Sequence, residues 1–276
     1  MPRNHLYIAG TGRAGTTFLV RYLTALGLDT TLSRRPQMQD NERANAGIEV
    51  APEHLDHEDS PYVIKSPWLY LVIDDLLDKG TFHADAVIIP VRDLGEAAAS
   101  RIIIEQQSII AESPNICSLK TPWDVWGRVA GGAIYSLNQT DEERLLAVGF
   151  HHLVERLVRA DIPIVFLHFP RFAVDGEYLF GALAPTLGQV TANMAREAFA
   201  RTAIPEKVRT TQELKAASTS NDVLLLQQQN AALKRENSML RSRTLRARRH
   251  QAKRMLSSIQ NFLLLRETRG AGRNVE

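Results

Sequence analysis

The sequence predicts an α/β protein in which a parallel sheet carries helices on both faces, followed by a long C-terminal helix. Short apolar runs rich in strand-forming residues alternate with longer stretches of helical periodicity. The 276 residues are 44% hydrophobic and 23% charged, which is ordinary for a globular chain and excludes disordered, collagen-like and disulfide-scaffold classes. A single cysteine, Cys117, excludes an internal disulfide and fits a reducing compartment. We expect a cytoplasmic protein, since no apolar run suits a membrane span or a signal peptide.

Each element is predicted from its own pattern. The strands are expected at 5–9, 62–65, 86–91 and 162–168. The helices are expected at 17–26, 69–78, 94–110, 124–136, 141–160 and 175–187, several of them ended by glycine. The polar segment 28–60 predicts a long loop with at most one short helix. Pro90 has no N–H to donate, so we expect it near the end of its strand.

The composition changes near residue 210, which predicts four parts. These are an α/β domain over 1–210, a linker over 211–222, a helix over 223–265 and a tail over 266–276. Residues 213–276 hold 13 basic and 5 acidic side chains, and the remainder holds 20 and 26. An acidic body of net charge −6 therefore precedes a basic tail of +8.

The tail contains a heptad pattern with leucine at each d position and asparagine at two a positions. Its a and d residues are Val223, Leu226, Asn230, Leu233, Asn237 and Leu240. Buried asparagines at a positions fix a two-stranded, in-register pair, which predicts a homodimer. The alternative is a single amphipathic helix lying on the body. We expect the basic stretch 241–254 to face solvent or a partner protein. An anionic membrane surface is the second interpretation, and nucleic acid is not expected as a partner.

A glycine-rich turn, Gly10-Thr-Gly-Arg-Ala-Gly-Thr-Thr17, joins the first strand to the first helix. Successive backbone N–H groups in such a turn, together with the helix N-terminus, can hold a phosphate-like anion. The glycine spacing matches a P-loop, but Thr16 stands where that motif has lysine. Ordinary ATP chemistry is therefore disfavoured, and the positive charge lies within the loop as Arg13.

The string Gly12-Arg-Ala-Gly-Thr-Thr17 resembles the 5′-phosphosulfate loop of sulfotransferases, with Ala14 in place of the usual serine. A second segment also resembles this family, because Arg92 follows a predicted strand and Ser100 comes eight residues later. In the family such a pair holds the 3′-phosphate of 3′-phosphoadenosine-5′-phosphosulfate. The segment Tyr62-Val-Ile-Lys65-Ser-Pro67 is similar to a strand end of bacterial members. The resemblance covers about residues 5–190.

The resemblance implies a P-loop-type sulfotransferase with that donor as co-substrate and no metal. Its nucleotide site would be formed by Gly12, Arg13, Ala14, Gly15, Thr16, Thr17, Arg92 and Ser100. Arg13 would help to hold the 5′-phosphosulfate, and Lys65 would neutralise the charge that develops on its bridging oxygen. The acceptor would carry a hydroxyl, as a glycan or another metabolite does. The general base that takes the proton of this hydroxyl would be Glu49 or Glu42, and His54 is the next candidate.

Other interpretations remain open from the sequence. The three tryptophans Trp68, Trp123 and Trp126 suit either core packing or stacking on an acceptor. A P-loop kinase is the alternative enzyme. A nucleotide-binding body that serves a coiled-coil scaffold without catalysis is the third possibility.

Overall fold

We describe the fold from a computed structural model of the chain. The described residues are 4–37, 47–55, 57, 59–112, 128–129, 132–133, 138–204 and, in the tail, 223–224, 226–227, 230 and 233–240. The chain divides into two compact units, with Leu224 in the first and Leu225 in the second. Each unit is described by itself.

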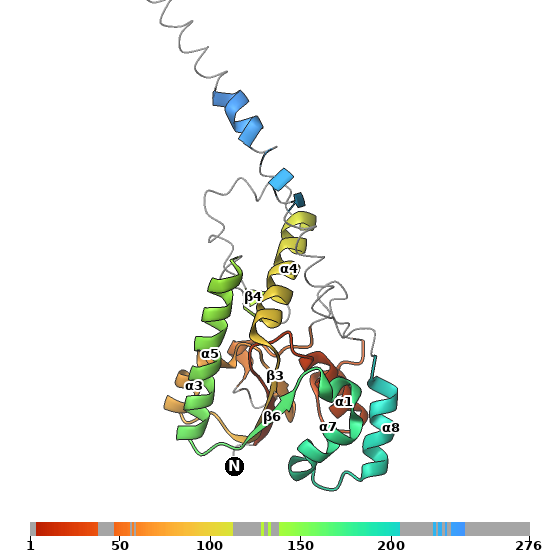
Figure 1. The fold of residues 1–276 in the computed structure, drawn as a ribbon. Helices are drawn as coiled ribbons and strands as arrows, with labels where there is room; N and C mark the ends of the chain where they lie inside the picture. The colour runs from red at the N-terminus through yellow and green to blue at the C-terminus, as the bar shows by residue number, and fades with distance from the viewer. Residues whose placement is uncertain are drawn as a thin grey trace, which may run out of the picture. The chain divides into compact units, whose positions relative to one another are not determined.

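A four-stranded parallel sheet forms the centre of the first unit (Figure 1). Its strands are β1 (His5–Ile8), β2 (Val63–Lys65), β3 (Ala84–Val91) and β6 (Ile164–His168), in the order β2-β1-β3-β6. All three pairings are parallel, which confirms the predicted strands and sheet type. Since parallel strands end at the same edge, the segments that follow β1, β2 and β3 meet there.

Pro90 lies one residue before the end of β3, as expected. The pairing of β1 with β3 stops at Ile8 and Ile88, where the chain turns away into the glycine loop. Pro90 pairs only with Leu167 of β6. The missing N–H of Pro90 therefore falls where β1 no longer offers an acceptor.

Helices cover both faces of the sheet. They are α1 (Thr16–Ala25), α2 (Thr31–Arg34), α3 (Leu69–Asp78), α4 (Leu94–Glu112), α5 (Gln139–Arg159), α6 (Arg171–Val174), α7 (Gly176–Leu183) and α8 (Ala192–Thr202). The predicted helices that begin near residues 17, 69, 94, 141 and 175 are confirmed, the last as α7 followed by a 3₁₀ turn. Single 3₁₀ turns occur at Pro52–His54 and Ala184–Thr186.

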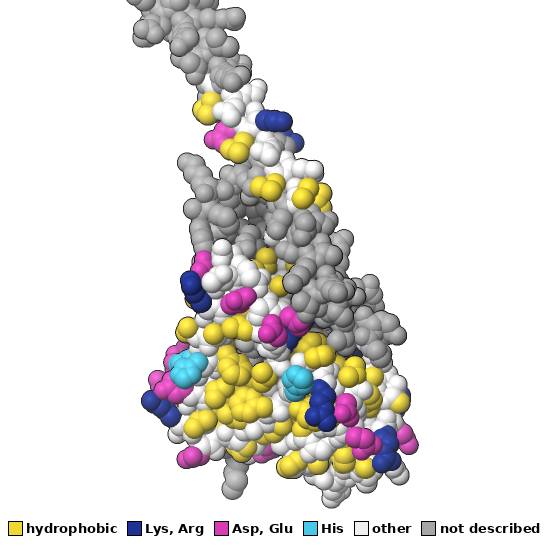
Figure 2. Space-filling view, in the orientation of Figure 1, with side chains coloured by type: hydrophobic (Ala, Val, Ile, Leu, Met, Phe, Trp, Pro, Cys, Tyr) yellow, Lys and Arg dark blue, Asp and Glu magenta, His cyan; other side chains and the backbone are white. Residues whose placement is uncertain are grey.

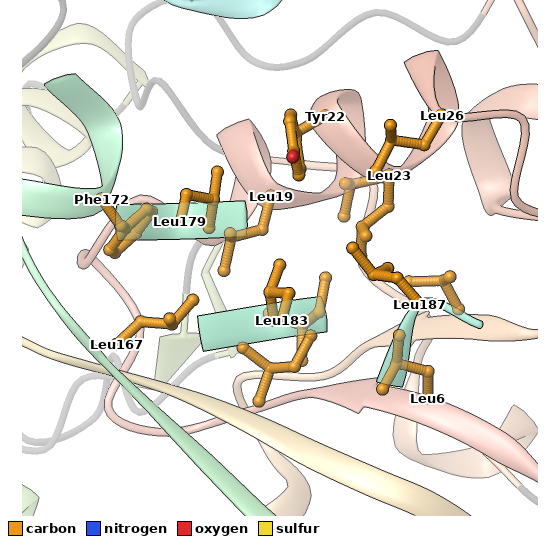
Figure 3. Packing of buried hydrophobic residues seen from close by; sticks show 14 of the residues in the cluster. Leu6, Leu19, Tyr22, Leu23, Leu26, Leu167, Phe172, Leu179, Leu183 and Leu187 are labelled. Atoms are coloured by element: carbon orange, nitrogen blue, oxygen red, sulfur yellow. The ribbon is translucent and has the colours of Figure 1, made fainter. Parts of the chain in front are cut away.

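Two hydrophobic clusters result from the alternation of side chains along the strands. Leu6 and Ile8 face a cluster built on α1, α6 and α7, where Leu19 and Leu23 pack on Leu183 and its neighbours (Figure 3). Tyr7 and Ala9 face the other cluster, which α3 and α5 cover. In the first cluster, burial raises the pKa of Tyr22 to about 12, so its hydroxyl is neutral at ordinary pH.

Two predictions of local structure are corrected. The helix expected over 124–136 is wrong, because β4 (Arg128–Val129) and β5 (Gly132–Ala133) form an antiparallel pair there. Adjacent glycines, Gly131 and Gly132, disfavour a helix and suit a tight turn. Helix α8 was not predicted, although Thr191 caps it by accepting the Met194 N–H.

Strand β6 lies at an edge of the sheet and exposes part of its apolar surface. Phe166 is 48% exposed, and its ring centroid lies 6.5 Å from that of Phe150 on α5. Figure 2 shows hydrophobic side chains gathered on this face over α5 and β6. On α5, the apolar residues Val148 and Val158 are also exposed.

In the tail, the described residues of 223–240 have helical backbone, and 233–240 form an unbroken run of about two turns. The rest of the predicted helix over 223–265 lies outside the described residues. Among the helices that the structure describes, none is both long enough and apolar enough to cross a membrane.

Candidate functional site

The glycine loop connects β1 to α1 through an unusual run of backbone angles. The φ angle is 109° at Gly10, 71° at Gly12, 54° at Arg13 and 77° at Gly15, which is also the N-cap of α1. Residues with positive φ among ordinary ones can turn successive N–H groups to one side, an arrangement that suits an anion. Arg13 adopts the left-handed region although it has a Cβ, at some cost in backbone free energy.

The loop rests on two aromatic rings. A Cβ built on Gly15 would lie 2.9 Å from Cζ of Phe172 and 3.2 Å from the ring of Phe169. Phe169 follows β6, and Phe172 lies in α6. Glycine is therefore required at this position for two reasons, its φ and the close approach of the rings.

Two arginines hold carbonyl groups of the loop. Arg92, directly after β3, donates from Nη1 to the Arg13 carbonyl at 3.0 Å. Arg101, in α4, donates from Nη2 to the Thr11 carbonyl. Both guanidinium groups are almost fully buried, with 3% and 1% of the side chain exposed. Hydrogen bonds from a charged donor are stronger than neutral ones, so these contacts fix two peptide planes of the loop.

Arg13 and Ser100 are in direct contact. Arg13 donates from Nε to Ser100 Oγ at 3.3 Å. Arg92 also pairs with Glu96 at 3.1 Å and lies over the ring of Phe169, 5.0 Å from its centroid. The residues that the resemblance assigns to the 5′- and 3′-phosphates therefore form one connected group.

Lys65 ends β2 and is buried beside the start of α1. Its ammonium group donates to Thr17 Oγ1 at 2.9 Å, to the Gly47 carbonyl at 2.6 Å and to Glu49 Oε1 at 2.9 Å. Glu49 also accepts the Gly47 N–H at 3.1 Å. Lys65 and Glu49 therefore form an ion pair at the sheet edge, with 1% and 8% of their side chains exposed.

Most of the predicted site residues thus come together. Hydrogen bonds connect Lys65 with Thr17 and Glu49, and Arg13 with Ser100 and Arg92. Gly12, Ala14, Gly15 and Thr16 belong to the same loop, in which Ala14 and Thr16 are buried. Glu42 lies outside the described residues.

His54 and Trp68 do not take part in the contacts just described. His54 is exposed, Trp68 is buried, and Trp123 and Trp126 lie outside the described residues. His152 of α5 pairs with Asp74 of α3 at 3.1 Å, which is a contact between two helices.

The sequence reasoning missed Arg101 and Glu142. Arg101 Nε lies 3.7 Å from Glu142 Oε1, and Glu142 is fully buried in the first turn of α5. A signal existed, since Arg101 precedes three isoleucines and so had to be buried with a partner. The partner, 41 positions away in the printed sequence, could not be found from spacing.

Comparisons with known proteins add no family. No family model matches the chain, and no curated protein matches it. Within the described part of the chain, no three His, Cys, Asp or Glu side chains are grouped so that they could hold a metal ion.

We predict that Gly15→Ala destabilises the protein by about 2 kcal/mol, because the new methyl group meets both strain at positive φ and the two phenylalanine rings. The free energy of unfolding from denaturant titration measures this loss.

Gly27→Ala is the matched control. Gly27 also has positive φ, 86°, but nothing lies within 4 Å of its added Cβ. Its cost should be about 1 kcal/mol from the backbone alone. Equal losses in the two variants would contradict the role of the aromatic rings.

Proposed function

We propose that this protein is a P-loop-type sulfotransferase that moves a sulfuryl group from 3′-phosphoadenosine-5′-phosphosulfate to a hydroxyl. The observation that supports this most strongly is the connected group at the carboxyl edge of the sheet. There, Arg13 contacts Ser100, Arg92 holds the loop, and Lys65 contacts Thr17. Open α/β sheets bind ligands at this edge. The same residues carry the family resemblance.

In the proposed reaction, the acceptor oxygen forms a bond to sulfur as the bond from sulfur to the bridging phosphate oxygen breaks. The electron pair stays on the leaving adenosine 3′,5′-bisphosphate, and the acceptor proton passes to a base. Such a transfer depends on positioning and on stabilising the charge that develops on the leaving oxygen. Loop N–H groups, Thr16 and Thr17 would hold the 5′-phosphosulfate.

Lys65 is suited to the leaving oxygen because it already contacts Thr17, in the first turn of α1. To donate to the nucleotide, its ammonium group would give up one of its present hydrogen-bond partners. Among these partners, Glu49 is the one that also carries a charge. Glu49 can therefore act either as the base for the acceptor or as the group that positions Lys65.

The P-loop kinase remains the alternative enzyme. Thr16 stands where the P-loop motif has its lysine, and this weighs against a kinase. The buried Lys65 does not take that position in the loop, because it belongs to β2. A non-catalytic nucleotide-binding body is the third possibility. The contacts of Lys65 with Thr17 and Glu49 weigh against it, because a buried lysine and a carboxylate beside the loop suit the proposed chemistry.

We further propose a carbohydrate or similar hydroxyl-bearing acceptor, a cytoplasmic location, and a homodimer formed through the tail. Support for the dimer comes from the apolar heptad residues, because Val223, Leu226 and Leu233 are 50%, 57% and 55% exposed. Pairing with a second copy would remove this apolar surface from water. The basic stretch 241–254 could also meet an anionic membrane surface, whereas nucleic acid is not proposed as a partner.

Adenosine 3′,5′-bisphosphate should bind the protein, and Arg92→Ala should weaken binding at least about tenfold. The substitution removes a charged donor from the phosphate site and from the Arg13 carbonyl. Isothermal calorimetry on the full chain measures both affinities.

Arg171→Ala is the control for this variant, because Arg171 lies exposed in an i,i+4 pair with Asp175. It should bind the nucleotide as the native protein does. If the native protein bound ATP with Mg²⁺ but not the bisphosphate, the kinase would replace the sulfotransferase.

Glu49→Gln separates the two roles of Glu49. If Glu49 is the base, kcat for sulfuryl transfer should fall about 10²- to 10⁴-fold with nucleotide affinity little changed. If it only positions Lys65, the loss should be small, because glutamine can still accept from the ammonium group. Steady-state kinetics with a hydroxyl-bearing acceptor decides between them. Lys65→Met should reduce kcat in both cases.

Leu233→Glu should convert the native dimer to a monomer, because a charge at a d position opposes pairing. Sedimentation equilibrium gives the mass of each protein. Leu224→Glu is the matched control, since Leu224 is 42% exposed but lies outside the a and d positions. A native mass of one chain, or equal behaviour of the two variants, would argue against the dimer.

A further inference from the structure

Arg101 is a buried charge that the proposed reaction does not use. Its side chain is 1% exposed, and the neighbouring α4 residue Ser100 already contacts Arg13. A guanidinium group is charged at every ordinary pH, so burying it is costly unless it is paired and hydrogen-bonded. Arg101 has both kinds of contact, to the Thr11 carbonyl and to Glu142.

The contact with the Thr11 carbonyl has a directional consequence. In a trans peptide, the carbonyl of one residue and the N–H of the next point in opposite directions. When Arg101 draws the Thr11 carbonyl toward α4, the Gly12 N–H points away from α4. Arg92 does the same two residues further on, since it holds the Arg13 carbonyl and thereby orients the Ala14 N–H.

We propose that Arg101 is a positioning residue that aims the Gly12 N–H into the anion cradle, and that Glu142 holds Arg101 in place. The identity of the anion as a 5′-phosphosulfate rests on the proposed function, but the orientation of the Gly12 N–H does not. Glu142 belongs to α5, so this pair connects the packing of α4 on α5 to the glycine loop. The cradle is then complete only when α5 is docked.

Two variants separate this role from a purely structural one. Arg101→Met alone leaves Glu142 as a buried, uncompensated charge, and this variant should be unstable. The double variant Arg101→Met with Glu142→Leu replaces the whole pair by apolar side chains, a change that often preserves stability. The double variant should therefore be stable and yet lack the hold on the Thr11 carbonyl.

The probes are inorganic sulfate, followed by NMR at the Gly12 amide, and adenosine 3′,5′-bisphosphate, followed by calorimetry. Sulfate should shift the Gly12 resonance in the native protein and not in the double variant. The double variant should bind the nucleotide about tenfold more weakly, since one charge-assisted hydrogen bond no longer orders the loop. Arg156→Met, which breaks an α3–α5 ion pair to Asp74, is the control and should change neither result.

A double variant with native sulfate response and native affinity would overturn the inference, and so would a native Gly12 amide that does not respond to sulfate. If sulfate shifts Gly12 in an Arg101-dependent way but the nucleotide does not bind, the inference stands and the proposed function fails.

Discussion

The structure depends on one constraint, the orientation of the peptide planes between β1 and α1. An anion cradle of backbone N–H groups requires that the matching carbonyls have partners on the other side. Two buried arginines provide those partners, Arg92 after β3 and Arg101 in α4. The rings of Phe169 and Phe172 support the loop at Gly15. A loop of small residues thus takes its shape from segments far away in the sequence.

Much of the fold and of the candidate site could be predicted from local patterns in the sequence. The four strands, the glycine loop and the Arg92–Ser100 spacing are local signals, because hydrophobic periodicity and glycine placement act within a few residues. The Arg101–Glu142 pair could not be predicted, since only the packing of α4 on α5 brings the two residues together. The expected helix over 124–136 failed because its apolar periodicity outweighed Gly131 and Gly132 in the prediction.

The charges at the site explain how an acidic body could hold a polyanion. Three cations at the sheet edge each lie beside a glutamate, in the pairs Lys65–Glu49, Arg92–Glu96 and Arg101–Glu142, at 2.9, 3.1 and 3.7 Å. Such pairs hold the buried cations in fixed positions, and they add little net positive field. Recognition of a nucleotide at such a site depends on geometry more than on bulk attraction.

The aromatic support beneath Gly15 has a consequence for the order in which the site can be assembled. The loop precedes β6 in the chain, but Phe169 and Phe172 come after β6, the last strand among the described residues. Domains are synthesised from the N-terminus, and their early segments wait for later ones. A nascent chain that ends before β6 has the complete loop sequence but lacks the rings on which the loop rests. The glycine loop is therefore synthesised before β6 and yet is among the last parts of the sheet edge to reach its final form.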